Sequence, residues 1–271
     1  MITTININNR MNMISEMEND SKFQVLEYEP LRASNTIKSA ISIRNLNELG
    51  LALKQVRIVL DDSAIKLQDG ILSFMKGSIF VKDDLSDVPK FRVKSFNFRD
   101  SEKERVKTSF KGTGEIFLEP SFEYFTLIQL EDEEIIVNDN IFCACEDAIE
   151  VSIITEETAA SKLLDEDGII QLRLKGSGIA VLKLPVPENE ILRCKLYKDN
   201  LIINGEFVVL RTGRVNFNVD ESDDKLVNVY SGIGEVWLIP SKNIYDYIEQ
   251  LDSEDYTEEE YDDESDEEDE D

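Results

Sequence analysis

The chain has 271 residues, of which 41% are apolar, and a formal net charge of −28. A chain of this length can bury about 70% of its unfolded surface, so the composition indicates a soluble globular protein. The sequence contains no histidine, which excludes imidazole metal sites and acid–base catalysis by imidazole.

The two ends of the chain are predicted to lie outside a single folded domain at 22–251. Residues 1–21 contain neither the apolar core of a signal peptide nor a transmembrane run, which predicts a poorly ordered leader and a cytoplasmic protein. Met11, Met13 and Met17 are alternative translation starts to Met1. Residues 252–271 hold fifteen acidic side chains and no basic one, which predicts a disordered acidic tail.

The first part of the domain is predicted to be strand-rich. A short alternating strand begins at Phe23, and a mixed segment over 41–53 contains a short helix that Asn45 would cap and Gly50 would interrupt. From Val56 to Val81, apolar and polar residues alternate between Asp-Asp and Asp-Gly breaks, which is typical of a β-meander.

One stretch recurs three times, as FKGTGEIFLEP at 110–120, LKGSGIAVLKL at 174–184 and YSGIGEVWLIP at 230–240. Each copy alternates like a strand, and paired glycines inside a strand mark a bulge, a bend or the close approach of another backbone. A nucleotide-binding loop would need a third glycine and a following helix, and both are missing. The repeat therefore predicts architecture rather than a ligand site.

A second pattern, LxxxxIxV followed by a turn and a strand, also occurs three times. It begins at Leu60, Leu130 and Leu196, so the chain starts with one half of a repeat unit and ends with the other. This order predicts a closed fold with pseudo-threefold repetition, in which the last glycine strand pairs with the 56–81 meander and buries Trp237 against it. Polar loops are expected over 83–107 and 155–167, and a short helix is expected over 241–251.

No residue pattern predicts a catalytic, cofactor-binding or metal site. Cys143, Cys145 and Cys194 are too few ligands for zinc, and they are interpreted as small apolar side chains, with Cys143 and Cys145 on one strand face. The acidic groups at 61–62, 131–134 and 223–224 are interpreted as solvated turns.

The glycine strands and the segment LIQLEDEEIIVNDNIFCACEDAIEV resemble the bacterial branch of the family named for altered inheritance of mitochondria, over roughly 22–247. The resemblance implies a fold similar to the tryptophan RNA-binding attenuator protein, a closed antiparallel all-β arrangement of the double-stranded β-helix type. It implies no catalytic residues.

The sequence thus predicts a non-catalytic scaffold or protein-interaction module without a cofactor, which forms a homo-oligomer or binds a basic partner through its tail. The alternative, taken from the attenuator-like fold, is an RNA- or small-ligand-binding protein in which Lys111 and Lys175 contact phosphate; Ser231 stands at the third equivalent position. Before the tail, 29 basic residues stand against 42 acidic ones, which disfavours general binding of DNA or RNA.

Overall fold

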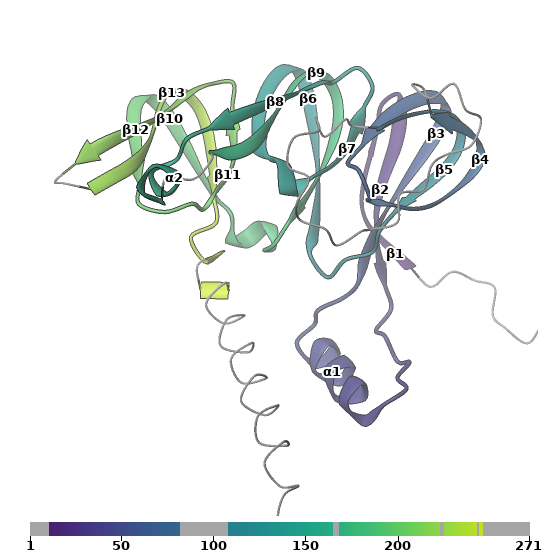
Figure 1. Ribbon diagram of the computed structural model, residues 1–271. Helices are drawn as coiled ribbons and strands as arrows, with labels where there is room; N and C mark the ends of the chain where they lie inside the picture. The colour runs from purple at the N-terminus through teal and green to yellow at the C-terminus, as the bar shows by residue number, and fades with distance from the viewer. Residues whose placement is uncertain (1–10, 82–107, 165–167, 223–224, 243, 246–271) are drawn as a thin grey trace, which may run out of the picture.

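The computed structural model describes residues 11–81, 108–164, 168–222, 225–242 and 244–245 (Figure 1). The expected acidic tail, the whole 83–107 loop and most of the C-terminal helix lie outside these described residues. The beginning of that helix is present, where the backbone N–H groups of Ile244 and Tyr245 donate to the Ser241 carbonyl.

The described chain is dominated by strands, as the alternating patterns predict. The strands are β1 Met11–Glu18, β2 Ser21–Tyr28, β3 Lys54–Leu67, β4 Leu72–Val81, β5 Thr108–Leu118, β6 Tyr124–Asn138, β7 Phe142–Glu146, β8 Glu150–Glu156, β9 Ile169–Leu184, β10 Leu192–Ile203, β11 Val208–Thr212, β12 Arg214–Ser222 and β13 Lys225–Leu238. The helices are α1 Ile37–Glu48, α2 Ala159–Leu164 and the short 3-10 helices η1 Asp139–Ile141 and η2 Glu188–Glu190.

The strands form one antiparallel sheet that is open rather than closed. Its path runs β1-β2-β3-β7-β9-β6-β11-β13-β10, with β4, β5, β8 and β12 attached to it. The path has two separate ends, β1 and β10, which do not pair with each other. The expected closure of the fold is therefore wrong.

Each glycine strand pairs with the meander that precedes it in sequence. β5 lies between β3 and β4, β9 pairs with β6, β7 and β8, and β13 pairs with β10, β11 and β12. The prediction that β13 pairs with the 56–81 meander is wrong. Trp237 is buried, but among Val209, Leu210 and Ile239 rather than against that meander. Pairing between strands that are close in sequence closes shorter loops and therefore costs less conformational entropy.

The same β-bulge occurs in β3, β6 and β10, directly opposite a glycine pair. Leu60, Leu130 and Leu196 oppose the second glycine of each pair, and the register shifts just after them. Leu60 and Ile65 are both buried although they are five residues apart. An odd spacing would place them on opposite faces of a regular strand, so the extra bulge residue returns Ile65 to the buried face.

In two of the three bulges, the residue between the two glycines accepts a hydrogen bond from a backbone N–H group of the bulge. Asp62 and Asp132 have positive φ angles of 49° and 56°, and their backbone N–H groups donate to the hydroxyls of Thr113 at 3.0 Å and Ser177 at 2.9 Å. The third bulge has Lys198 at φ 66°, opposite Ile233, which carries no hydroxyl. The Gly-Thr-Gly and Gly-Ser-Gly copies thus combine room for a backbone with an acceptor for the bulge.

The glycines admit a neighbouring backbone, as the repeat predicts. A Cβ atom on Gly112 would lie 2.0 Å from the Ser78 carbonyl oxygen, and one on Gly232 would lie 2.2 Å from that of Arg214. Both glycines also have positive φ angles, which other residues rarely adopt. The close approach of a neighbouring strand therefore explains the paired glycines.

The buried apolar side chains form three hydrophobic clusters, and the groups of strands that carry them follow one another along the sheet (Figure 1). The N-terminal cluster contains Phe23, Ile58 and Ile116, the central cluster contains Phe142 and Leu174, and the C-terminal cluster is built on β10 to β13. Strand β7 is buried along its whole length and contributes to both of the first two clusters. Strands β6 and β9 also contribute side chains to both, so these three strands together join the two clusters.

Two local expectations near the N-terminus are wrong. Residues 11–18 form β1, which pairs with β2, so this part of the expected 1–21 leader is a strand. The helix expected inside 41–53 begins earlier, at Ile37. Thr36 caps it instead of Asn45, because its hydroxyl accepts the Ser39 N–H at 3.1 Å.

Candidate interaction surface

The most distinctive exposed surface lies on the N-terminal part of the sheet. Its strands run in the order β1, β2, β3, β5 and β4, and we call the side turned away from the N-terminal cluster the outer face. The outer face includes the side chains of Met13, Glu16, Gln24, Arg57, Phe74, Phe80, Glu115 and Phe117. Four strand spacings separate β1 from β4, so the outer face is about 19 Å wide.

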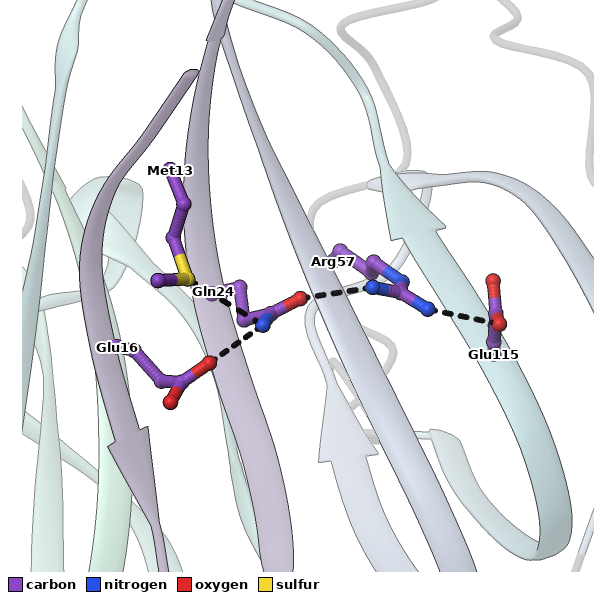
Figure 2. A network of polar contacts seen from close by, with 5 residues as sticks. All are labelled: Met13, Glu16, Gln24, Arg57 and Glu115. Atoms are coloured by element: carbon purple, nitrogen blue, oxygen red, sulfur yellow. Dashed lines mark hydrogen bonds and ion pairs between the residues drawn. The ribbon is translucent and has the colours of Figure 1, made fainter. Parts of the chain in front are cut away.

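A row of polar contacts crosses four of these strands (Figure 2). The Gln24 side-chain amide donates to Glu16 on β1 and to the Met13 sulfur at 3.4 Å, and its carbonyl oxygen accepts from Arg57 on β3 at 3.0 Å. Arg57 also donates to Glu115 on β5 at 2.8 Å. Each charged group in the row is thus held by a neighbour.

The row also influences the charge of one of its members, Glu115. The hydrogen bond from Arg57 lowers the pKa of Glu115 below its usual value. The Arg57 Nε atom is buried and has no hydrogen-bond partner, so the guanidinium is held within the row by its two terminal nitrogens. The outer face therefore presents an immobilised polar stripe.

Apolar side chains flank the stripe on both sides. Phe74 stacks on Phe117 with ring centroids 4.4 Å apart and an interplanar angle of 14°, yet Phe74 remains 49% exposed. Phe80 lies on the same side of β4 and is 53% exposed, and Met13 is exposed at the opposite edge. Exposed large apolar residues around an ordered polar stripe are typical of a surface that binds another protein.

Sequence reasoning did not single out this surface. Its sequence signal is the segment LSFMKGSIFV, where Phe74 and Phe80 point to the outer face while Met75, Ile79 and Val81 pack on the cluster. A strand with apolar side chains on both faces can bury one face in the core, and the other face is then available to a binding partner. The polar row carries no comparable signal, because Arg57 and Glu115 are 58 residues apart.

A second polar cluster lies between α2 and the strands β11 and β13. Arg211 is almost fully buried, donates to Glu156, and donates to the Val215 carbonyl at 3.1 Å. Asn228 accepts the Ala159 N–H at 2.9 Å and donates to the Gly205 carbonyl at 3.0 Å. The Asn228 contacts tie α2 to β13, whereas the Arg211 Nε atom is buried without a hydrogen-bond partner.

Burial also raises the pKa of Tyr230, whose ring packs beside Phe217 with centroids 5.1 Å apart. The Tyr230 hydroxyl therefore stays protonated over the physiological pH range.

Among the described residues, Glu146 has the most buried carboxyl side chain. Its two oxygens accept the Ser21 N–H at 2.8 Å, the Asn19 side-chain amide at 2.8 Å and the Ile179 N–H at 3.0 Å. A Cβ on Gly178 would lie 2.8 Å from one of these oxygens, so the glycine makes room for the carboxyl group. Glu146 connects the β1–β2 turn to β7 and β9, which is a structural role.

The structure does not bring the two predicted phosphate contacts together on one strand pair. Lys111 on β5 lies opposite Ala64 and Phe80, whereas Lys175 on β9 lies opposite Glu134 and Glu150. Two flanking carboxyl groups make Lys175 a poor phosphate ligand. The surroundings of these two lysines therefore do not specifically favour nucleic-acid binding.

The acidic pairs lie in bulges rather than in hairpin turns. Asp61 and Asp62 occupy the bulge of β3, and Glu131 and Asp132 that of β6, whereas residues 223–224 lie outside the described residues. These groups are exposed as predicted, with Glu134 half-buried, but the predicted turns are wrong for 61–62 and 131–134, because both groups lie within strands. Across the described ranges, no group of three or more acidic or cysteine side chains is placed to hold a metal ion.

The three cysteines are free, and two of them are buried. Cys143 belongs to the N-terminal cluster and Cys145 to the central one, so the expected shared face is not observed. The bulge between Phe142 and Ala144 shifts the alternation of β7 and sends the two thiols into different clusters.

Burial raises the pKa of the Cys143 thiol to about 12. At pH 8 about one molecule in ten thousand carries the reactive thiolate, so we expect Cys143 to resist iodoacetamide in the folded protein. Half-buried Cys194 is expected to react first, and all three thiols should react after unfolding in guanidinium. Mass spectrometry of tryptic peptides measures each rate. Equal labelling of Cys143 and Cys194 in the folded chain would contradict the buried position of Cys143.

No helix in the described part of the chain is long and apolar enough to cross a bilayer.

Comparisons with known proteins give a family and a fold. The model of the family described as Mitochondrial biogenesis AIM24 matches residues 48–241. A crystal structure of a structural-genomics protein from Streptococcus pyogenes is similar, with a TM-score of 0.52 and 14% sequence identity. The match covers 74% of this chain and 94% of that one. At this identity the likeness concerns the fold alone. No curated protein matches the chain.

Proposed function

This chain belongs to the AIM24 mitochondrial biogenesis family, and we propose that it acts as a non-catalytic protein-interaction module whose binding surface is the outer face. The observation that carries the proposal is the pair of exposed phenylalanines on β4 beside the fixed polar stripe of Gln24, Arg57 and Glu115. The partner that fits is a protein that brings an apolar side chain to Phe74 and Phe80 and backbone or side-chain hydrogen-bonding groups to the stripe.

The energetics of such a surface favour a protein over a small ligand. Burying an exposed phenylalanine side chain contributes about 1.5–3 kcal/mol, and aromatic residues dominate the binding energy of many protein interfaces. The stripe adds specificity, because its charged groups are already oriented and little side-chain entropy is lost on binding. A shallow sheet face offers no enclosed volume in which a small molecule would bury most of its surface.

Affinity capture with two matched variants tests the proposal. Phe80→Ser removes an exposed ring from the outer face, and Tyr197→Ser removes an exposed ring from β10, at the other end of the sheet. We expect a protein captured by the natural chain to be lost with Phe80→Ser and retained with Tyr197→Ser. Thermal melting of all three proteins should agree within about 2 °C, since both rings are exposed.

Two results would contradict the proposal. Equal capture by the natural chain and Phe80→Ser would show that the outer face is not the binding surface. Capture that is abolished by ribonuclease would support instead the alternative, in which the protein binds RNA.

A further inference from the structure

Helix α1 stands on an arm that leaves the sheet between β2 and β3. Residues 29–53 form this arm, which we call the α1 arm, and Figure 1 shows the helix projecting away from the strands. The Tyr28 N–H donates to the Leu53 carbonyl at 2.9 Å and closes the base of the arm. Within the arm, the Asn47 side chain donates to the Leu31 carbonyl at 2.9 Å. The arm is therefore an ordered projection with its own internal contacts.

The helix has an unusually exposed apolar side. None of its residues is buried. Ile37 is 83% exposed and Ile41 is 54% exposed, and their spacing of four residues places them on one helix face. Leu49, which follows the helix, is 74% exposed. An isolated helix of twelve residues is marginally stable in water, and most helices in proteins gain their stability by packing an apolar face. Among the residues that the structure describes, none packs the Ile37/Ile41 face into a core.

The α1 arm also differs from the rest of the chain in charge. It contains Arg32, Lys38 and Arg44 against Glu29 and Glu48, a net charge of +1, and residues 31–53 alone carry +2. Because the whole chain carries −28, the sequence outside 31–53 carries −30 (−28 less +2). Lys38 and Arg44, the latter paired with Glu48 at 2.7 Å, therefore lie beside an apolar face in a chain whose remaining sequence carries a large negative charge.

We propose that the Ile37/Ile41 face of α1 packs on the acidic body of a second copy of this chain. A second copy offers carboxyl groups to Lys38 and Arg44 together with apolar surface to the two isoleucines, which matches both properties of the helix. An anionic lipid surface would attract the same basic side chains by about 1 kcal/mol each, and the acidic remainder of the chain would be repelled by either partner, so the vesicle measurement below separates the two. The α1 arm thus acts as a self-association element, separate from the outer face.

The solution mass tests this inference through two neighbouring substitutions. Ile41→Glu places a charge on the apolar face, whereas Ser42→Glu makes the same charge change about 100° further around the helix. By analytical ultracentrifugation of the full chain, we expect the natural protein and Ser42→Glu to sediment as a multiple of 31.0 kDa. Ile41→Glu should sediment at 31.0 kDa, with an association constant at least tenfold weaker. Circular dichroism and melting curves of the two variants confirm that both fold.

Further measurements distinguish a second copy of the chain from other binding partners of the Ile37/Ile41 face. A natural chain that remains at 31.0 kDa up to about 100 μM, or association that survives Ile41→Glu, would overturn the inference. Association lost on deletion of residues 252–271 would show that the tail, not the body, is the binding element, and would also overturn it. Flotation with phosphatidylserine vesicles that depends on Ile41 would assign the face to lipid. Phe80→Ser should leave the mass unchanged, so this test and that of the outer face fail independently.

Discussion

A chain with Gly112→Ala is expected to melt about 10–20 °C below the natural protein, or to lose cooperative folding. The new Cβ would lie 2.0 Å from the Ser78 carbonyl oxygen, and backbone cannot move aside as a flexible side chain can. Gly112 also has φ 146°, which is strained for alanine. Strain of about 1–3 kcal/mol and overpacking of a similar size together predict the loss, since about 2–4 °C accompany each kcal/mol in a domain of this size.

The Gly70→Ala variant separates backbone strain from overpacking, which are the two contributions to the expected loss of stability. Gly70 has φ 76° in a turn, and a Cβ there would have nothing within 4 Å. We therefore expect this variant to show the conformational strain alone, about 1–2 kcal/mol or a few degrees. Differential scanning calorimetry of the three proteins measures the difference. Similar melting temperatures for Gly70→Ala and Gly112→Ala would show that β4 does not cross the glycine strand as closely as described.

The glycine repeat shows how far the sequence predicts this fold. The alternation of Phe110, Ile116 and Leu118 with polar residues identifies β5 as a strand, and the paired glycines indicate close approach of another backbone. The repeat does not say which backbone approaches. The order of the half-repeats allows each glycine strand to pair with the meander before it or with the one after it, and only the second choice requires closure of the sheet. The structure adopts the first, which keeps the paired segments close in sequence.

The bulges could have been predicted from spacing alone. The five-residue separation of Leu60 and Ile65, repeated at Leu130 and Ile135, violates the period of two for a strand with one buried face. An inserted residue between them restores the period, and Asp62 and Asp132 are among the residue types that tolerate positive φ.

The outer face and the α1 arm were less accessible to prediction from sequence. Both surfaces are defined by apolar side chains that stay exposed in the fold, and a sequence pattern does not show which apolar side chains stay exposed. Ile37 and Ile41 have the spacing of residues on a packed helix face, yet both are exposed. The interactions of Glu146 illustrate the same limit, because its partner Ser21 is 125 residues away.

Glu146→Ala is expected to destabilise the folded chain by about 3–5 kcal/mol, or about 10–15 °C in melting temperature. The substitution removes the acceptor of the Ser21 and Ile179 N–H groups, both of which belong to buried residues, and of the Asn19 side chain. A buried N–H without a partner costs about 1–3 kcal/mol, and the vacated volume adds to this.

The matched control is Glu150→Ala, which removes an exposed carboxyl group four residues further along the chain. It should change stability by less than about 0.5 kcal/mol. Glu146→Gln keeps one acceptor oxygen but turns an amide N–H toward a donor, so we expect an intermediate loss. Amide hydrogen exchange locates the effect: in Glu146→Ala the Ser21 and Ile179 amides should exchange at least tenfold faster, while the Ile116 amide in the N-terminal cluster changes less. If Glu146→Ala melts as the natural protein does, the carboxyl group does not hold the β1–β2 turn against β9. The N-terminal hairpin, and with it the Met13 edge of the outer face, would then be positioned by its strand pairing with β3 alone.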